Sequence, residues 1–160
     1  MRRADREIPE ITLIEEIIHK ADVCRVALAN ENSPYIVTMN FGYTPAPEQK
    51  LFFHCAKVGR KLDMIRKNNY VCFEMDTDHE IYGGKKGCDW GMKFSSVVGY
   101  GNISFVTEKE AKIQGLNCIM AHYGGEKEYS YNEKVLSRTT ILCLDTVSYT
   151  HLTLPTNREV

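Results

Sequence analysis

At 160 residues the chain has the length of one domain, enough to bury a continuous core without disulfides or metals. The hydrophobic fraction of 43%, the charged fraction of 26% and the formal net charge of -1 give no basic field that would attract nucleic acid or an anionic membrane. No apolar run approaches the roughly 18–20 residues that cross a bilayer, and no signal peptide is evident, so we expect a cytoplasmic protein.

The first third of the chain predicts one helix and three strands. Thr12-Leu13-Ile14-Glu15 has the form of a capping box, and the helix is expected to run to about Lys20. Residues 24–29 and 35–40 have the composition of strands, and the turn residues between them predict a hairpin. Two prolines then indicate a loop before a third strand at residues 51–54.

The rest of the chain predicts three more strands and two helices. A helix is expected over residues 59–67, a strand over 70–76, a long loop over 77–90 and a strand over 94–106. In that strand Gly99 and Gly101 indicate a bulge or a close backbone approach. A helix over residues 108–123 and a last strand over 139–146 follow.

This order of elements contains no βαβ repeat, so it disfavours a doubly wound parallel sheet. It favours a mainly β (α+β) fold in which a barrel with peripheral helices leaves few exposed strand edges. We expect one domain over residues 1–146. Residues 147–160 form an atypical tail that we expect to pack poorly.

The strongest candidate site lies where the third strand passes into the next helix. The sequence LFFHCAKVGRKLDMIR places Arg60 and Lys61 at the start of that helix. A helix N-terminus carries free N–H groups and partial positive charge, so cations there are unfavourable unless an anion offsets them. The pattern therefore predicts a site for a terminal phosphate rather than an ordinary solvated helix end.

Other residues admit two interpretations each. His54 ends an apolar strand and is either a hydrogen-bonded rim residue or a proton donor beside a ligand. Trp90, the only tryptophan, either belongs to a core or dimer contact or covers a planar ligand. Ser95 and Ser96 either face solvent or bond a phosphate or a ring edge. The six cysteines show no metal-ligand spacing, so no metal site is expected.

Several short motifs, in order, resemble the flavin-binding split-barrel superfamily that includes pyridoxamine 5′-phosphate oxidase. The resemblance is greatest to the branch related to 5-nitroimidazole resistance proteins, and it covers about residues 1–145. The motifs that carry it are Arg2-Arg3 with Asp5-Arg6, Pro34-Tyr35-Ile36-Val37, Asn40-Phe41-Gly42-Tyr43, Phe53-His54-Cys55-Ala56, Gly59-Arg60-Lys61-Leu62-Asp63, Val71-Cys72-Phe73-Glu74, Cys88-Asp89-Trp90 and Ser95-Ser96-Val97-Val98-Gly99-Tyr100-Gly101.

The resemblance implies a six-stranded antiparallel split β-barrel that forms a homodimer, with a flavin at the interface. FMN is the usual cofactor of the family, and FAD is possible. Arg60 and Lys61 resemble the residues that hold the flavin phosphate, and His54 resembles a histidine near the ring. The full set of implied cofactor-binding residues is Val37, Thr38, Met39, Asn40, His54, Ala56, Lys57, Arg60, Lys61, Trp90, Ser95 and Ser96. Of these, Trp90, Ser95 and Ser96 are expected to reach the flavin of the second subunit.

The activity that the resemblance implies is reduction of a small nitro-aromatic or related acceptor, with NAD(P)H as donor and His54 as the catalytic proton source. The arginine-rich substrate motif of pyridoxamine phosphate oxidases is missing, which disfavours that reaction. The alternative is a split-barrel protein that holds a flavin or a haem without efficient turnover.

Overall fold

The computed structural model describes residues 10–153, with side chains described for residues 10–149. Arg2-Arg3 and Asp5-Arg6 therefore lie outside the described residues. The elements are α1 (Ile11–Lys20), β1 (Cys24–Asn30), β2 (Ser33–Met39), β3 (Phe41–Thr44), β4 (Lys50–Ala56), α2 (Arg60–Lys67), β5 (Tyr70–Tyr82), a 3-10 turn (Gly87–Asp89), β6 (Gly91–Val106), α3 (Lys109–Gly124), α4 (Glu133–Leu136) and β7 (Thr139–Thr153).

The described strands form one antiparallel sheet in the order β2-β1-β5-β6-β7-β4-β3. The predicted fold class, an antiparallel sheet with peripheral helices, is confirmed, as is the β1–β2 hairpin. The sequence predicts six strands, and the described residues contain a seventh, β3. This strand has only four residues between Asn40 and Pro45, too few for a strand pattern to be visible.

The core fills the side of the sheet on which α1 packs. Phe41, Phe53 and Phe73 are fully buried there. Helix α1 contributes isoleucines spaced three and four residues apart, namely Ile14, Ile17 and Ile18, which lie on one helical face. This amphipathic pattern explains why the helix was predictable.

The predicted capping box is wrong, because α1 has Glu10 at its N-cap and no side chain caps it. Glu15 makes tertiary contacts instead. Its carboxylate accepts hydrogen bonds from the Tyr43 hydroxyl at 3.3 Å and from the backbone N–H of Ala46 at 2.9 Å. The carboxylate thus anchors the loop after β3 rather than the helix start.

Two predicted boundaries are wrong because long strands pair beyond them. The expected loop over residues 77–90 is mostly a hairpin, in which β5 continues to Tyr82 and β6 begins at Gly91. The last strand passes the expected end at residue 146 and continues to Thr153 against β6. A register shift leaves Val147 as a bulge between the pairs Gly101–Thr146 and Tyr100–Ser148.

The close backbone approach expected at Gly99 and Gly101 is confirmed. A Cβ at Gly99 would meet the Phe73 ring, and one at Gly101 would meet the Asp145 carbonyl oxygen. Beyond this point, Tyr149 packs against the core, and its ring meets that of Phe73 edge-on at 6.1 Å. Tyr149 is therefore packed, whereas Val147 and Ser148 are exposed and residues 154–160 lie outside the described residues.

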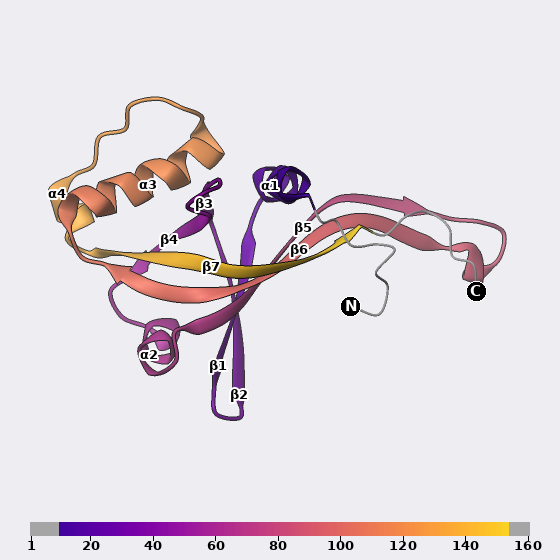
Figure 1. Cartoon of the computed structure of the whole chain (residues 1–160), viewed down its shortest axis with the longest axis horizontal. Helices are drawn as coiled ribbons and strands as arrows, with labels where there is room; N and C mark the ends of the chain where they lie inside the picture. Colours follow the sequence, from indigo (N-terminus) through magenta and orange to yellow (C-terminus); the bar gives the residue numbers. More distant parts are fainter. Residues whose placement is uncertain (1–9, 154–160) are drawn as a thin grey trace.

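The helices lie on different sides of the sheet (Figure 1). Helices α3 and α4 cover the side formed by β3, β4 and β7, whereas α2 lies across the sheet from them. The β5–β6 hairpin projects away from α2 and α3. Among the described helices, none has the length and apolar composition needed to cross a bilayer.

Gly42 sets how closely α3 approaches the sheet, which leads to a stability prediction. A Cβ at Gly42 would collide with the backbone of Cys118 and Ile119. We expect Gly42→Ala to destabilise the fold by about 1–3 kcal/mol, because backbone atoms cannot move aside as a side chain can. The free energy of unfolding in urea measures this effect.

Gly87→Ala is the control, because a Cβ at Gly87 has nothing within 4 Å. Equal stabilities of the two variants would show that α3 does not depend on contact at Gly42.

Candidate functional site

The start of α2 carries positive charge that no carboxylate of the described residues neutralises. Lys57, Arg60 and Lys61 fall within five residues, and none forms an ion pair in the described part of the chain. Asp63, the acidic residue of the first turn, pairs with Arg66 at 2.9 Å. The concentration of cations that the sequence predicted is therefore available to an anion.

The backbone before α2 is open. Gly59 has φ +147°, which favours glycine, and a Cβ there would meet nothing within 4 Å. No side chain caps the helix, and the Gly59 carbonyl accepts the N–H groups of Leu62 and Asp63 at 2.9 and 3.3 Å. Uncapped N–H groups beside unpaired cations are a suitable site for a phosphate.

Arg60 joins this helix start to β2. Its Nη2 donates to Ser33 Oγ at 3.3 Å, and its guanidinium lies 4.7 Å from the centre of the Tyr35 ring. Arg60 is thereby held at β2, the strand that carries the predicted cofactor-binding residues Val37, Thr38 and Met39. Neither Ser33 nor Tyr35 was among the predicted site residues, and only the three-dimensional contact identifies them.

The predicted residues of β2 lie on an edge strand. Val37 and Met39 face the core, whereas Thr38 and Asn40 are exposed. Strand β2 pairs with β1 alone in the described sheet, so its other edge offers backbone N–H and C=O groups to a ligand or a second chain.

Asn40 and His54 lie at the same end of the β3–β4 pair. Phe41 pairs with Phe53 in this antiparallel pair. Asn40 comes just before Phe41 and His54 just after Phe53, so both lie beyond the same end of the pair. From His54 to Ala56, β4 pairs with β7 on one edge and has no strand on its other edge within the described residues. The structure therefore brings the predicted residues of β2, the end of β4 and the start of α2 into one region.

His54 and Lys61 nevertheless lie on opposite faces of β4. Side chains alternate along a strand, so His54 faces away from buried Phe53 and partly buried Cys55. Lys61 lies on the Cys55 side, where burial raises the pKa of the Cys55 thiol and the charge of Lys61 opposes that rise. His54 instead lines a cavity of about 350 Å³ beneath α3 and α4.

Trp90, Ser95 and Ser96 are not brought to this region within one chain. Trp90 lies in the projecting β5–β6 hairpin, is 57% exposed and donates its indole N–H to the Gly84 carbonyl at 3.2 Å. Ser96 is buried opposite Asp76, and Ser95 pairs with Thr77. Their role toward a second subunit stays a prediction.

The sequence interpretation missed an ionic cluster on the outer face of β1 and β5. Arg25 Nη1 donates to Glu74 Oε2 at 3.0 Å and also to Asp76, whose other oxygen lies 2.9 Å from His79 Nε2. Glu74 and Asp76 alternate with buried Phe73 and Met75, a signal that both carboxylates share one face. The pairing with Arg25 depends on strand register, which the sequence does not display.

The cluster shifts the two carboxylates in opposite directions. Burial and the neighbouring Asp76 charge raise the pKa of Glu74, against the effect of Arg25. Burial also acts to raise the pKa of Asp76, but hydrogen bonds from Arg25 and His79 outweigh it, and the pKa of Asp76 is lowered. Arg25 and His79 together thus keep Asp76 ionised, whereas at Glu74 burial and the Asp76 charge outweigh Arg25.

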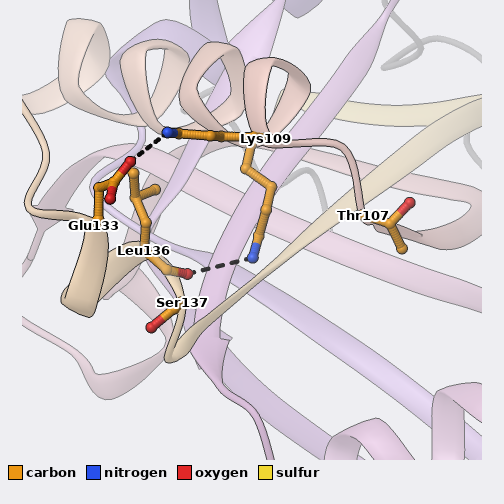
Figure 2. A pocket seen from close by; sticks show the side chains of 6 residues that line it. Thr107, Lys109, Glu133, Leu136 and Ser137 are labelled. Carbon is orange, nitrogen blue, oxygen red and sulfur yellow. Dashed lines mark hydrogen bonds and ion pairs between the residues drawn. The ribbon is translucent and has the colours of Figure 1, made fainter.

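A second cavity, of about 290 Å³, separates α4 from the start of α3 (Figure 2). Lys109 pairs with Glu133, and Lys112 Nζ donates to the Leu136 carbonyl at 3.3 Å. Both lysine side chains thus bond to α4, and they hold this short helix against α3. A third cavity, of about 370 Å³, lies between α1 and α3. Among the described residues, no group of three side chains could hold a metal ion.

Comparisons with known proteins agree with this architecture. Residues 12–151 match the pyridoxamine 5′-phosphate oxidase family. Among solved structures, a candidate 5-nitroimidazole antibiotic resistance protein from Bacteroides thetaiotaomicron is 29% identical, with a TM-score of 0.79 over 91% of this chain and 84% of that one. Among curated protein sequences, none matches the chain.

Two more distant structures share the fold. The FAD and heme binding protein from Mycobacterium smegmatis is 12% identical, with a TM-score of 0.83 over 97% of this chain and 77% of that one. A FAD-binding protein from Mesorhizobium loti is 16% identical, with a TM-score of 0.66 over 94% of this chain and 98% of that one.

The ionic cluster leads to a prediction about pH. The lowered pKa of Asp76 contributes stability above its unfolded pKa of about 3.9, and this contribution is lost as pH falls through the folded value. The raised pKa of Glu74 has the opposite effect, because it lowers the stability of the fold as pH rises above the unfolded pKa. Arg25→Gln leaves two ionised carboxylates facing each other at pH 7, so we expect a loss of about 1 kcal/mol there for this half-exposed site. Thermal unfolding at pH 7 and pH 4 should show a smaller loss at the lower pH.

Lys93→Gln removes the same charge from an ion pair with Glu80 in the exposed hairpin, and serves as the control. An Arg25→Gln loss that is the same at both pH values would contradict the account.

Proposed function

The chain belongs to the pyridoxamine 5′-phosphate oxidase family, and from this premise we propose that it is a flavin-nucleotide-binding reductase of small nitro-aromatic or related acceptors. Membership supports the flavin, and the 29% identity to the candidate nitroimidazole resistance protein supports the acceptor class. FMN is the proposed cofactor, and FAD is the alternative. NAD(P)H is the proposed electron donor, and the cytoplasm is the proposed location.

The single observation that carries the proposal is the unpaired positive charge at the start of α2. Arg60 and Lys61 flank uncapped backbone N–H groups, and Arg60 is held toward β2 by Ser33 and Tyr35. These residues fit a flavin phosphate, because they supply charge, hydrogen-bond donors and open space at Gly59 together.

The ring would then lie between β2 and the end of β4. The exposed Thr38 and Asn40 and the unpaired edge at residues 54–56 supply polar groups there. We propose a homodimer in which the β5–β6 hairpin of one copy covers the flavin of the other. The exposed apolar residues Ile81, Trp90 and Met92 of that hairpin support this arrangement.

A bound flavin supplies the chemistry, since it can accept a hydride from a reduced nicotinamide and pass two electrons to an acceptor. The protein positions the acceptor and moves the proton. His54 makes no hydrogen bond within the described residues, so its imidazole is available to donate a proton to the reduced group.

An absorption spectrum of the purified protein, with mass analysis of the released cofactor, is the first test. Flavin bands with FMN or FAD released, and acceptor-dependent oxidation of NAD(P)H, are the expected results. A haem band, or flavin without turnover, would favour the alternative of a binding protein. A colourless protein that takes up no added flavin would refute the proposal.

Removing the two cations tests the phosphate site. We expect Arg60→Ala with Lys61→Ala to weaken flavin binding at least tenfold, because two charge-assisted contacts are lost, while the melting temperature of the apoprotein changes little. Fluorescence titration with FMN measures the affinity.

Arg66→Ala with Lys67→Ala is the matched control, since it removes the same two residue types from the other end of α2. Unchanged FMN affinity in the first variant, or an equal loss in the second, would exclude this site.

Replacing His54 tests its catalytic role. We expect His54→Ala to retain flavin but to lower the rate of acceptor reduction by 10²–10⁴-fold, the usual contribution of a general acid, and to flatten the pH profile. Stopped-flow measurement of flavin reoxidation by the acceptor separates this step from NAD(P)H oxidation. His19→Ala, an exposed histidine on α1, is the control. A full rate in His54→Ala would make the residue structural.

A further inference from the structure

The cavity beside His54 lies between the end of β4 and a wall made by α3 and α4. Its volume is about 350 Å³, near the lower limit for small-molecule sites. Leu116, Ile119 and Met120 of α3 and Val135 and Leu136 of α4 give it an apolar lining. Its polar lining residues are His54, Ser130, Tyr131, Asn132 and Thr139.

Most of these polar groups form hydrogen bonds within the wall of the cavity. The Tyr131 hydroxyl donates to Asn117 Oδ1 at 2.8 Å, Asn132 Oδ1 caps α4 by accepting from Lys134 N at 2.9 Å, and Thr139 Oγ1 donates to the Val135 carbonyl at 2.9 Å. His54 and Ser130 make no side-chain hydrogen bond within the described residues. One imidazole and one hydroxyl are therefore available to a ligand.

The wall is held in place from behind. On the opposite side of α4, Glu133 pairs with Lys109 and the Leu136 carbonyl accepts from Lys112 (Figure 2). Leu136 is buried between the two cavities and lines both. These contacts fix a four-residue helix that could not be stable alone, and they leave Val135 63% exposed although it lines the cavity.

We propose that this cavity binds the body of the acceptor: a small, uncharged, largely apolar molecule of about one ring, with a hydrogen-bond-accepting group directed at His54. The volume limits the size, and the apolar lining with no lysine, arginine or carboxylate disfavours a charged ligand. Val135 and Met120 would set which acceptors fit. The inference rests on the proposed function for the role of the ligand as acceptor.

The position of the cavity suits this role. His54 lies six residues before Arg60, so the cavity and the start of α2 are at most about 20 Å apart along the extended chain. The unpaired edge of β4 at residues 54–56 connects the two. A ligand in the cavity would meet a cofactor held by Arg60 and Lys61 at this edge.

The test fills the cavity from an exposed position. Nitrobenzene is the probe, and its affinity for the protein is measured by NMR titration in the absence of any donor. We expect Val135→Trp to weaken nitrobenzene binding at least tenfold and to raise the KM for nitrobenzene, with FMN affinity unchanged. Val135→Arg places a charge in the apolar lining and should also weaken nitrobenzene binding and raise the KM. It replaces Val135→Trp in the test if the tryptophan variant does not fold.

Val147→Trp is the matched control. Val147 is 65% exposed, close to the value for Val135, and lies on β7 eight residues beyond Thr139. Toluene, which has the same ring without an acceptor group, should bind the wild-type protein several-fold more weakly than nitrobenzene if His54 donates a hydrogen bond.

The outcomes separate this inference from the proposed function. If the wild-type protein takes up flavin but both Val135 variants keep its nitrobenzene affinity and KM, the cavity assignment is overturned and the proposed function stands. If no flavin is taken up, the proposed function fails, and the affinity comparison still decides whether the cavity binds the probe. An equal loss in Val147→Trp would also overturn the assignment.

Discussion

The close contact of α3 with the sheet is the constraint on which this side of the molecule depends. Two glycines permit it. Gly42 of β3 lies against the backbone of Cys118 and Ile119, and Gly115 of α3 lies against Phe52 and Ile141. Side chains at either position would push the helix outward, and the cavity beneath it would lose its shape.

The end of α3 extends this constraint to the rest of the fold. His122 Nε2 lies 2.9 Å from the Ala21 carbonyl, and the Tyr123 hydroxyl donates to the Asp22 carbonyl at 2.8 Å while accepting from Phe41 N. These contacts tie α3 to the corner between α1 and β1. The helix is thereby fixed at both ends, by Lys109 and Lys112 toward α4 and by His122 and Tyr123 toward α1.

How much of this could be predicted from the sequence depends on whether the relevant contact is local. The α2 start was predictable because Gly59, Arg60 and Lys61 are adjacent and their chemistry is unusual for a helix end. The Arg25 cluster was not, because Arg25 meets Glu74 only through the register of β1 and β5. The cavity wall was missed for the same reason, since α4 has four residues and owes its place to Lys109. Glu15 is the converse case. The local pattern predicted that it would cap the helix, but its carboxylate instead accepts a hydrogen bond from the distant Ala46 N–H.

Electrostatics also distinguishes the two faces of β2, because Thr38 lies on the outer face, whereas Ser33 and Tyr35 lie on the alternate face. Near Thr38, Arg25 is neutralised by Glu74 and Asp76, and two carboxylates for one guanidinium leave that face unfavourable to an anion. Near Ser33, Arg60 has no carboxylate partner within the described residues, and the α2 N-terminus adds its dipole. An elongated ligand with one anionic end would therefore lie with that end at α2 and its uncharged end toward Asn40 and His54. That orientation directs the uncharged end to the unpaired edge of β4, beside the cavity that α3 and α4 enclose.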